Sequence, residues 1–201
     1  MYAPVVLVWF VNFGISIWNA YAVGKAWVET KHYGGWPRFM AWMGAVMSAC
    51  GFSWCYLLVL VAVARGLDWL DDDHVLLALR IGYILIIPAV LSSGLMIMLD
   101  SWARAYRTRT IGSIGSAAWN TYAQIHNTFH AIKDLDRAFA GVMDMLEKSA
   151  GSSDKKKGGG AALVLVFVLV ILALVSGILT TAVIINRFAG EDDLPEEVPK
   201  G

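Results

Sequence analysis

Four long apolar stretches dominate the pattern of hydrophobic and polar positions along this chain. They run over residues 4–24, 39–64, 75–99 and 161–185. A helix needs about 20 mostly apolar residues to cross the ~30 Å hydrocarbon core of a bilayer, and each stretch is long enough. Because backbone N–H and C=O groups must be paired within lipid, each stretch is expected to be helical. The pattern therefore predicts four transmembrane helices.

A different periodicity lies between the third and fourth stretches. Over residues 117–150, large apolar side chains recur in steps of three and four, the a/d spacing of a heptad seam, with Asp136 as an interruption. Residues 108–116 and 151–160 are rich in Gly, Ser and Thr or Lys, which predicts flexible linkers on both sides. The seam consists of Tyr122, Ile125, Phe129, Ile132, Phe139, Met143 and Leu146. We therefore expect an all-α integral membrane protein with four transmembrane helices plus one long amphipathic cytoplasmic helix.

Composition agrees with this class of protein. The 201 residues are 58% hydrophobic and 16% charged, whereas soluble domains are about 25% charged. Sixteen basic residues balance sixteen acidic ones, which gives no basic patch for nucleic acid and argues against a disordered chain. Along the chain we expect four units: a three-helix transmembrane unit over 1–99, a cytoplasmic segment over 100–160, the fourth transmembrane helix over 161–185 and an acidic external tail over 186–201.

The distribution of Lys and Arg predicts an orientation. These residues concentrate in the loops over 25–38 and 100–160, whereas the other side carries Arg65, Arg187 and Lys200 beside many acidic residues. Cytoplasmic loops retain positive charge, so we expect both basic loops in the cytoplasm and both termini outside. The first stretch lacks a positive region before it, so it is expected to stay as an anchor. The short loops favour a multi-pass protein of the bacterial inner membrane.

Polar side chains inside the apolar stretches are candidate functional groups. Asn12, Ser16 and Asn19 fall on one stripe of the first stretch, where they must find partners. That stripe predicts either hydrogen bonds between helices or the lining of a pore. Arg80 lies near the outer end of the third stretch, where it is expected to snorkel toward lipid headgroups with Asp72 or Asp73 as a partner. A buried Arg80 would instead be a functional candidate.

Small residues recur along the second stretch. They let helix backbones approach closely in lipid, and we expect them to pack within the four-helix unit. The small residues are Ala41, Gly44, Ala45, Ser48, Ala49 and Ser53. Cys50 and Cys55 lie five positions apart and so point in different directions, which predicts no disulfide between them.

Candidate chemistry is sparse. His126, His130 and Asp134 recur every four residues and form a weak candidate for a metal site, but the Glu of a helical zinc-protease motif is missing. They lie off the seam, so a solvated polar face is the main expectation and no cofactor is predicted. No nucleophile–base–acid set and no phosphate-binding glycine loop occur, which predicts a protein that is not an enzyme. The segments 18–22 (WNAYA) and 119–123 (WNTYA) resemble each other, and we interpret this as coincidence.

The seam has no partner in so short a chain, and this observation carries the functional expectation. We expect a subunit or scaffold of a larger membrane assembly, in which the heptad-patterned helix docks onto a second copy or onto other membrane or cytoplasmic subunits. That helix could also lie in the membrane interface. One alternative is an oligomeric ion channel or small passive transporter with the stripe of residues 12, 16 and 19 along its path. A further alternative is a membrane sensor that recruits a soluble effector.

Overall fold

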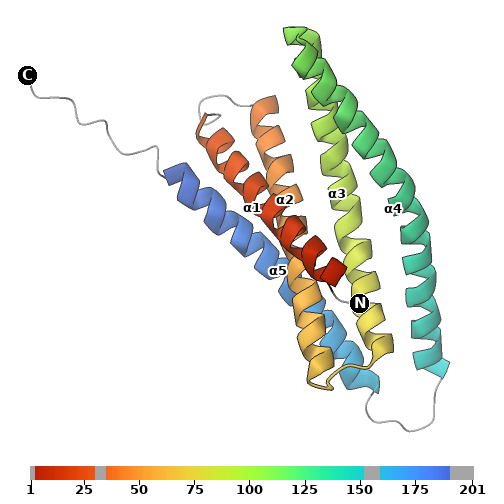
Figure 1. Cartoon of the computed structure of the whole chain (residues 1–201). Helices are drawn as coiled ribbons and strands as arrows, with labels where there is room; N and C mark the ends of the chain where they lie inside the picture. The colour runs from red at the N-terminus through yellow and green to blue at the C-terminus, as the bar shows by residue number, and fades with distance from the viewer. Residues whose placement is uncertain (1–2, 30–34, 152–158, 191–201) are drawn as a thin grey trace, which may run out of the picture.

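The structure, a computed structural model, describes residues 3–29, 35–151 and 159–190 (Figure 1). In this part of the chain all the regular structure is helical. The five helices are α1 (Ala3–Glu29), α2 (Trp36–Gly66), α3 (Asp72–Thr108), α4 (Ile111–Gly151) and α5 (Gly159–Gly190). Four of them, α1, α2, α3 and α5, are long and apolar enough to cross a membrane. This confirms the prediction of four apolar spanning helices in a multi-pass membrane protein.

The helices α1, α2 and α5 pack together on one side of the molecule (Figure 1). Ser48 of α2 donates a hydrogen bond to the carbonyl oxygen of Ser16 in α1 over 2.9 Å. The hydroxyls of Tyr56 in α2 and Thr180 in α5 lie 2.9 Å apart. The largest apolar side chains that are fully buried come from α2 and α5, namely Phe52, Leu57, Val166 and Val170. The core is therefore centred on the crossing of α2 and α5.

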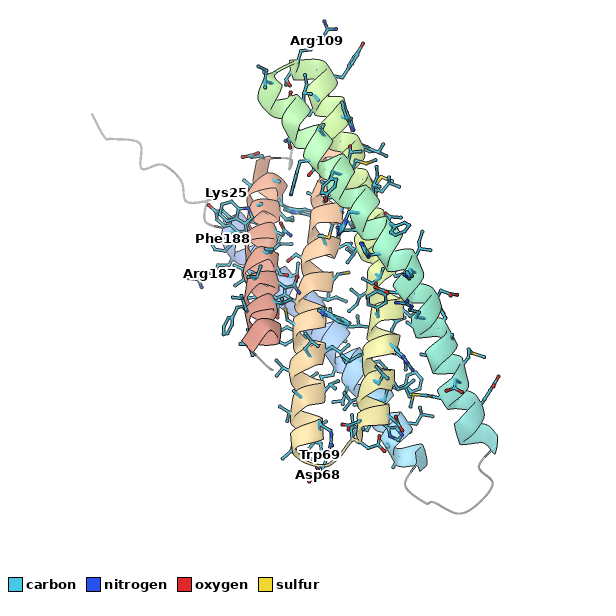
Figure 2. The ribbon with its side chains drawn as sticks, turned by 45° about the vertical axis from the view of Figure 1, so that its right-hand side comes forward. Lys25, Asp68, Trp69, Arg109, Arg187 and Phe188 are labelled. Carbon is cyan, nitrogen blue, oxygen red and sulfur yellow. The ribbon has the colours of Figure 1, made fainter. Side chains whose placement is uncertain are left out.

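The last turns of α1 and α5 lie side by side, so these two helices run in the same direction. The ring of Tyr21 in α1 packs edge-on against Phe188 in α5 with a centroid distance of 4.8 Å. Figure 2 shows Lys25 beside Arg187 and Phe188, far from the turn between α2 and α3. The start of α1 and the end of α5 thus point toward opposite ends of the bundle. This arrangement does not fit the expectation that both termini lie on the same side of the membrane.

A tight turn joins α3 to α4. Arg109 adopts the left-handed conformation (φ 52°) and its N–H bonds to the carbonyl of Ala105, which ends α3. The hydroxyl of Thr110 accepts a hydrogen bond from the N–H of Ser113 over 3.2 Å, which caps the first turn of α4. The prediction of a flexible linker over 108–116 is therefore wrong, because two capping residues suffice to reverse the chain and α4 begins at Ile111.

The helix α4 runs back along α3 over most of its length (Figure 1). The indole N–H of Trp102 donates to the hydroxyl of Thr121 over 2.8 Å near one end, and Arg80 packs against Gly141 near the other. The expected segment over 100–160 is therefore not a loop at one end of the bundle, because α4 crosses from one end to the other. The predicted linker over 151–160 lies mostly outside the described residues.

The packed face of α4 differs from the predicted seam. Ala117, Ala131 and Ala138 are buried against α3, while the seam residues Tyr122, Ile125, Phe129, Ile132, Phe139, Met143 and Leu146 are 38–71% exposed. Along the sequence, the buried residues Ala131 and Ala138 come directly before the exposed seam residues Ile132 and Phe139, so the buried face is rotated by about one residue from the seam. Small side chains let two helices approach closely, which the large seam side chains would prevent. Within the described chain the seam forms no coiled coil.

Candidate functional site: a carboxamide-lined cavity

A cavity of about 560 Å³ lies between α1, α2, α3 and α4. Ser16, Gly51 and Val90 are the middle residues of α1, α2 and α3, and all three line it. The cavity therefore lies halfway along the three apolar helices that form its walls. Its volume falls within the range of about 300–1,000 Å³ that is typical of small-molecule sites.

The lining combines an apolar wall with a set of uncharged polar side chains. Trp54, Ile86 and Ile87 contribute to the apolar wall. The polar side chains come from all four helices: Asn12, Ser16, Asn19, Cys50, Tyr83, Asn120, Gln124 and Asn127. Five of these eight carry a carboxamide, and none of the lining residues is charged. A carboxamide both donates and accepts hydrogen bonds, so the cavity offers both functions at mid-depth.

On the α1 side, hydrogen bonds to backbone fix two of these polar groups. The Nδ2 of Asn12 donates to the carbonyl oxygen of Gly51 over 3.4 Å, and Ser16 donates to the carbonyl of Asn12 over 2.8 Å. A Cβ at residue 51 would collide with the hydroxyl of Ser16, so the glycine permits this approach of α1 to α2. Asn12 and Ser16 are therefore held in place by the helix pair.

On the α4 side, the side chain of Gln124 is also held by a hydrogen bond to a backbone carbonyl. Its Nε2 donates to the carbonyl oxygen of Leu91 in α3 over 2.9 Å. A Cβ at Gly94 would collide with the Oε1 of Gln124. Gln124 thus joins α4 to α3 at the cavity wall.

Three carboxamides of the lining have no such anchor. Within the residues that the structure describes, the side chains of Asn19, Asn120 and Asn127 form no hydrogen bond, and Asn19 and Asn120 are half-buried. All three residues line the cavity, and Asn127 is exposed. An unpaired amide within hydrocarbon is costly, so these groups need water or a ligand.

The sequence pattern predicted only three of these eight polar side chains as candidate functional groups. It singled out Asn12, Ser16 and Asn19, which the structure places on the cavity wall. It missed the α4 residues Asn120, Gln124 and Asn127, although they repeat the same i, i+4, i+7 spacing. The resemblance of segments 18–22 and 119–123 was the available signal, because Asn19 and Asn120 are the matching second residues of the two segments. Their neighbouring Trp–Tyr ring pairs are also alike, with centroids 5.9 and 5.8 Å apart.

Arg80 lies between helices rather than beside the acidic turn. Its guanidinium packs on Gly141 of α4, and it borders a smaller hollow together with Asp134 and Arg137. Asp72, an expected partner of Arg80, instead forms an ion pair with Arg65 at 2.7 Å. Neither expected partner binds Arg80: Asp72 is held by Arg65 at the end of α2, and among the described residues no ion pair joins Arg80 to Asp73.

The histidine pair lies on the exposed face of α4. The rings of His126 and His130 have centroids 4.5 Å apart, and Asp134 is engaged with Arg137 at 3.5 Å. Among the described residues, no group of three His, Cys, Asp or Glu side chains could hold a metal ion. The predicted weak metal candidate therefore has two neighbouring imidazoles but no assembled third ligand in this part of the chain.

The predicted small-residue stripe of α2 faces α1 and α5. A Cβ at Gly44 would lie 2.6 Å from Val23 of α1, and Ala49 and Ser53 face Gly177 of α5. Ala41 and Ser48 are buried, while Ala45 lines a separate hollow next to α5. Cys50 and Cys55 are both free thiols.

Comparison of this chain with protein-family models, with curated proteins and with solved structures finds no match.

Proposed function

We propose that this protein is a non-enzymatic subunit of a larger membrane assembly and docks through the outward face of α4. The observation that carries the proposal is the exposure of all seven seam residues, of which Ile125, Phe129 and Ile132 border a hollow beside α3. The small-residue face of α4 is already occupied by α3. The large apolar face is left for a partner outside this chain.

The position of α4 argues against lipid or water alone as the environment of this face. The hydrogen bond from Gln124 to Leu91 sets α4 beside the apolar middle of α3. About 14 and 18 Å further along α4 than Gln124, the helix exposes Lys133 and Asp136, which form no ion pair within the described helices. Charged groups are costly in hydrocarbon, and a wide stripe of aromatic and aliphatic side chains is costly in water. A protein partner with both apolar and polar groups fits this mixed face better.

We further propose that the basic end of the bundle faces the cytoplasm. Arg38, Arg104, Arg107 and Arg109 gather at the end where α3 turns into α4, and Lys25 and Arg187 lie toward the same end in Figure 2. The other end carries the acidic turn with Asp68 and Asp71, together with the end of α4 and the start of α5 (Figure 1). Cytoplasmic segments retain Lys and Arg, which supports this orientation in a bacterial inner membrane.

The experiment compares particle masses after gentle extraction of the protein and its surrounding lipid from the native membrane. In one variant Ile125, Phe129 and Ile132 on α4 are replaced by Ser. In the control variant the same residue types on the exposed face of α5, Phe167, Ile171 and Ile178, are replaced by Ser. We expect the α4 variant to lose the assembly and the α5 variant to keep it. An assembly that survives in both variants, or is lost equally in both, contradicts docking through α4.

A second candidate function is a passive pathway for a small polar solute, which the carboxamide-lined cavity favours. Its polar groups lie at the middle of the spanning helices, where a permeating solute would need them. Replacing Asn12 and Asn19 by Leu should lower the flux of such a solute in reconstituted vesicles. A sensor that recruits a soluble effector through α4 would use the same docking face, and the effector would then be the co-purifying partner.

A further inference from the structure

We propose that the cavity between α1 and α4 binds an uncharged small molecule that has a hydrogen-bond donor and a hydrogen-bond acceptor attached to an apolar or aromatic body. Such binding needs neither an assembly nor permeation. It therefore stands apart from the docking proposal, and it gives a ligand class to the cavity that the second candidate function would use.

The unpaired carboxamides supply the polar part of the recognition. Asn19 comes from α1, whereas Asn120 and Asn127 come from α4. Each offers a donor and an acceptor, and none is satisfied by the described part of the protein. A ligand that both donates and accepts can pair with a carboxamide through two hydrogen bonds. A molecule that only accepts would bind the NH2 group and leave the carbonyl oxygen unpaired.

The charge of the lining excludes ionic ligands. No lining residue is charged, so an ion in this cavity would lose its hydration without gaining a counter-charge. Charged groups border two adjoining hollows rather than the cavity itself. Arg80, Asp134 and Arg137 line a hollow that shares Trp54 and Tyr83 with the cavity. Asp100, Arg104 and Arg107 line another, which shares Asn19, Met47 and Ile97 with the cavity.

The apolar wall supplies the rest of the binding energy. Trp54, Ile86, Ile87 and Val90 present aromatic and branched aliphatic surface to the cavity. Specific sites of this size are lined mainly by apolar side chains, with a few polar groups that fix the orientation of the ligand. A flat ring that carries a carboxamide has both features, so benzamide is a suitable probe.

The test uses three probes of the same shape and different charge. Binding of benzamide, benzoate and benzamidine is measured by saturation-transfer NMR on the full-length protein in lipid nanodiscs, with empty nanodiscs subtracted. We expect saturable binding of neutral benzamide and none of the anionic or cationic analogue. Equal binding of all three probes, or no saturable binding of benzamide, would overturn the proposal.

Variants locate the binding to the cavity. Replacing Asn19 and Asn120 together by Leu removes two hydrogen-bonding groups and should weaken benzamide binding about tenfold. The control is Asn186→Leu, the same change on α5 in a different hollow. Unchanged binding in the double variant, or an equal loss in the control, would overturn the assignment.

If the double variant does not fold, a second variant tests whether benzamide binds in the cavity. Ala123 lines the cavity from α4, and Ala123→Leu fills part of the space while leaving every carboxamide in place. We expect this variant to weaken benzamide binding while its thermal unfolding stays close to that of the original protein. Full-strength binding in Ala123→Leu would overturn the proposal. The docking test on α4 has a different readout, so either proposal can fail while the other holds.

Discussion

The guanidinium of Arg80 in α3 lies directly on Gly141 of α4. Its Nη1, Cζ and Nε atoms occupy the space that a Cβ on residue 141 would need. Glycine in the middle of a helix is unfavourable, since it loses more backbone freedom on folding than other residues do. Here it makes room for a half-buried cation between two packed helices, beside Asp134 and Arg137. The position of the Arg80 side chain on α3 therefore depends on residue 141 of α4 being glycine.

This contact predicts different effects for the same substitution at two positions of α4. Gly115 has no neighbouring atom within 4 Å of a built Cβ, so Gly115→Ala should raise the free energy of unfolding by up to about 1 kcal/mol through helix propensity alone. Gly141→Ala should gain clearly less, or lose stability, because Arg80 must move. Denaturant unfolding of the detergent-solubilised protein measures both changes.

The double variant Arg80→Ala/Gly141→Ala isolates the cause. Without the guanidinium, Gly141→Ala should raise the free energy of unfolding by about as much as Gly115→Ala does. A double-mutant cycle measures this coupling. If both glycine substitutions are equally stabilising in the original background, then Arg80 does not constrain residue 141.

A closer approach occurs where α5 crosses α2. A Cβ on Gly177 would lie 2.6 Å from the backbone nitrogen of Ser53 and 2.7 Å from the carbonyl oxygen of Ala49. Backbone atoms cannot rotate away as the end of a side chain can. We therefore expect Gly177→Ala to lower the free energy of unfolding by about 1–3 kcal/mol, the usual cost of overpacking. Gly14 on α1 has open space around it, so Gly14→Ala serves as the matched control. A similar stability for both variants would contradict the close crossing.

The spanning helices could be predicted because their signal is local. Each apolar stretch contains its own evidence, namely enough uncharged residues in a row to cross a bilayer. The ends were less well predicted, since α3 extends to Thr108 and α4 starts at Ile111. Those ends depend on single capping residues, Arg109 and Thr110, which look like linker residues in the sequence.

The arrangement of α4 could not be predicted from its periodicity, because the strongest apolar pattern marks the wrong face. In water the large side chains of the seam would be buried, which is why the heptad pattern predicts the seam as the packed face. Against an apolar neighbour such as α3, small residues such as Ala131 and Ala138 allow the closer fit. Because the seam was expected to be the packed face, the amides on the other flank of α4 were not predicted as functional groups. Asn120 and Gln124 lie on the flank of α4 that borders the cavity.

The start of α3 offers a test that depends on pH. Asp71 accepts a hydrogen bond from the N–H of His74 over 2.9 Å, as the N-cap of the helix. The hydrogen bonds from His74, first of its backbone N–H and then of its ring, hold the pKa of Asp71 below its usual value. A carboxyl whose pKa is lowered by folding stabilises the folded state above the pKa of the unfolded chain, about 3.9, and loses this effect as the pH falls further.

We therefore expect Asp71→Ala to lower the free energy of unfolding by about 0.5–2 kcal/mol at neutral pH, the usual range for a lost N-cap. The difference from the original protein should shrink as the pH falls below about 4. Asp71→Asn is the control, since it keeps a capping oxygen without a titrating group. Its stability should depend less on pH in this range than that of the original protein. A constant difference between Asp71→Ala and the original protein down to pH 3 would contradict the role of the ionised cap.

The direction of α5 depends on α4, because α4 returns the chain to the end of the bundle where α5 begins. Deleting residues 111–151 would leave nine residues between α3 and α5, which span about 30 Å when extended. The 37 residues of α3 are about 55 Å long, so this connection could not reach the original starting point of α5. We expect α5 to reverse its direction across the membrane or to lose its packing on α1 and α2.

Thiol labelling reports this change. Arg187 is exposed near the end of α5, so Arg187→Cys in a background with Cys50→Ala and Cys55→Ala provides one labelling site. A membrane-impermeant maleimide should reach this thiol from one side of the membrane in the full-length chain and from the other side after the deletion. The full-length Arg187→Cys chain is the control, because its contact between Tyr21 and Phe188 keeps α5 parallel to α1. Labelling from the same side in both proteins, with α5 still protected from proteolysis, would mean that α5 finds its direction without α4.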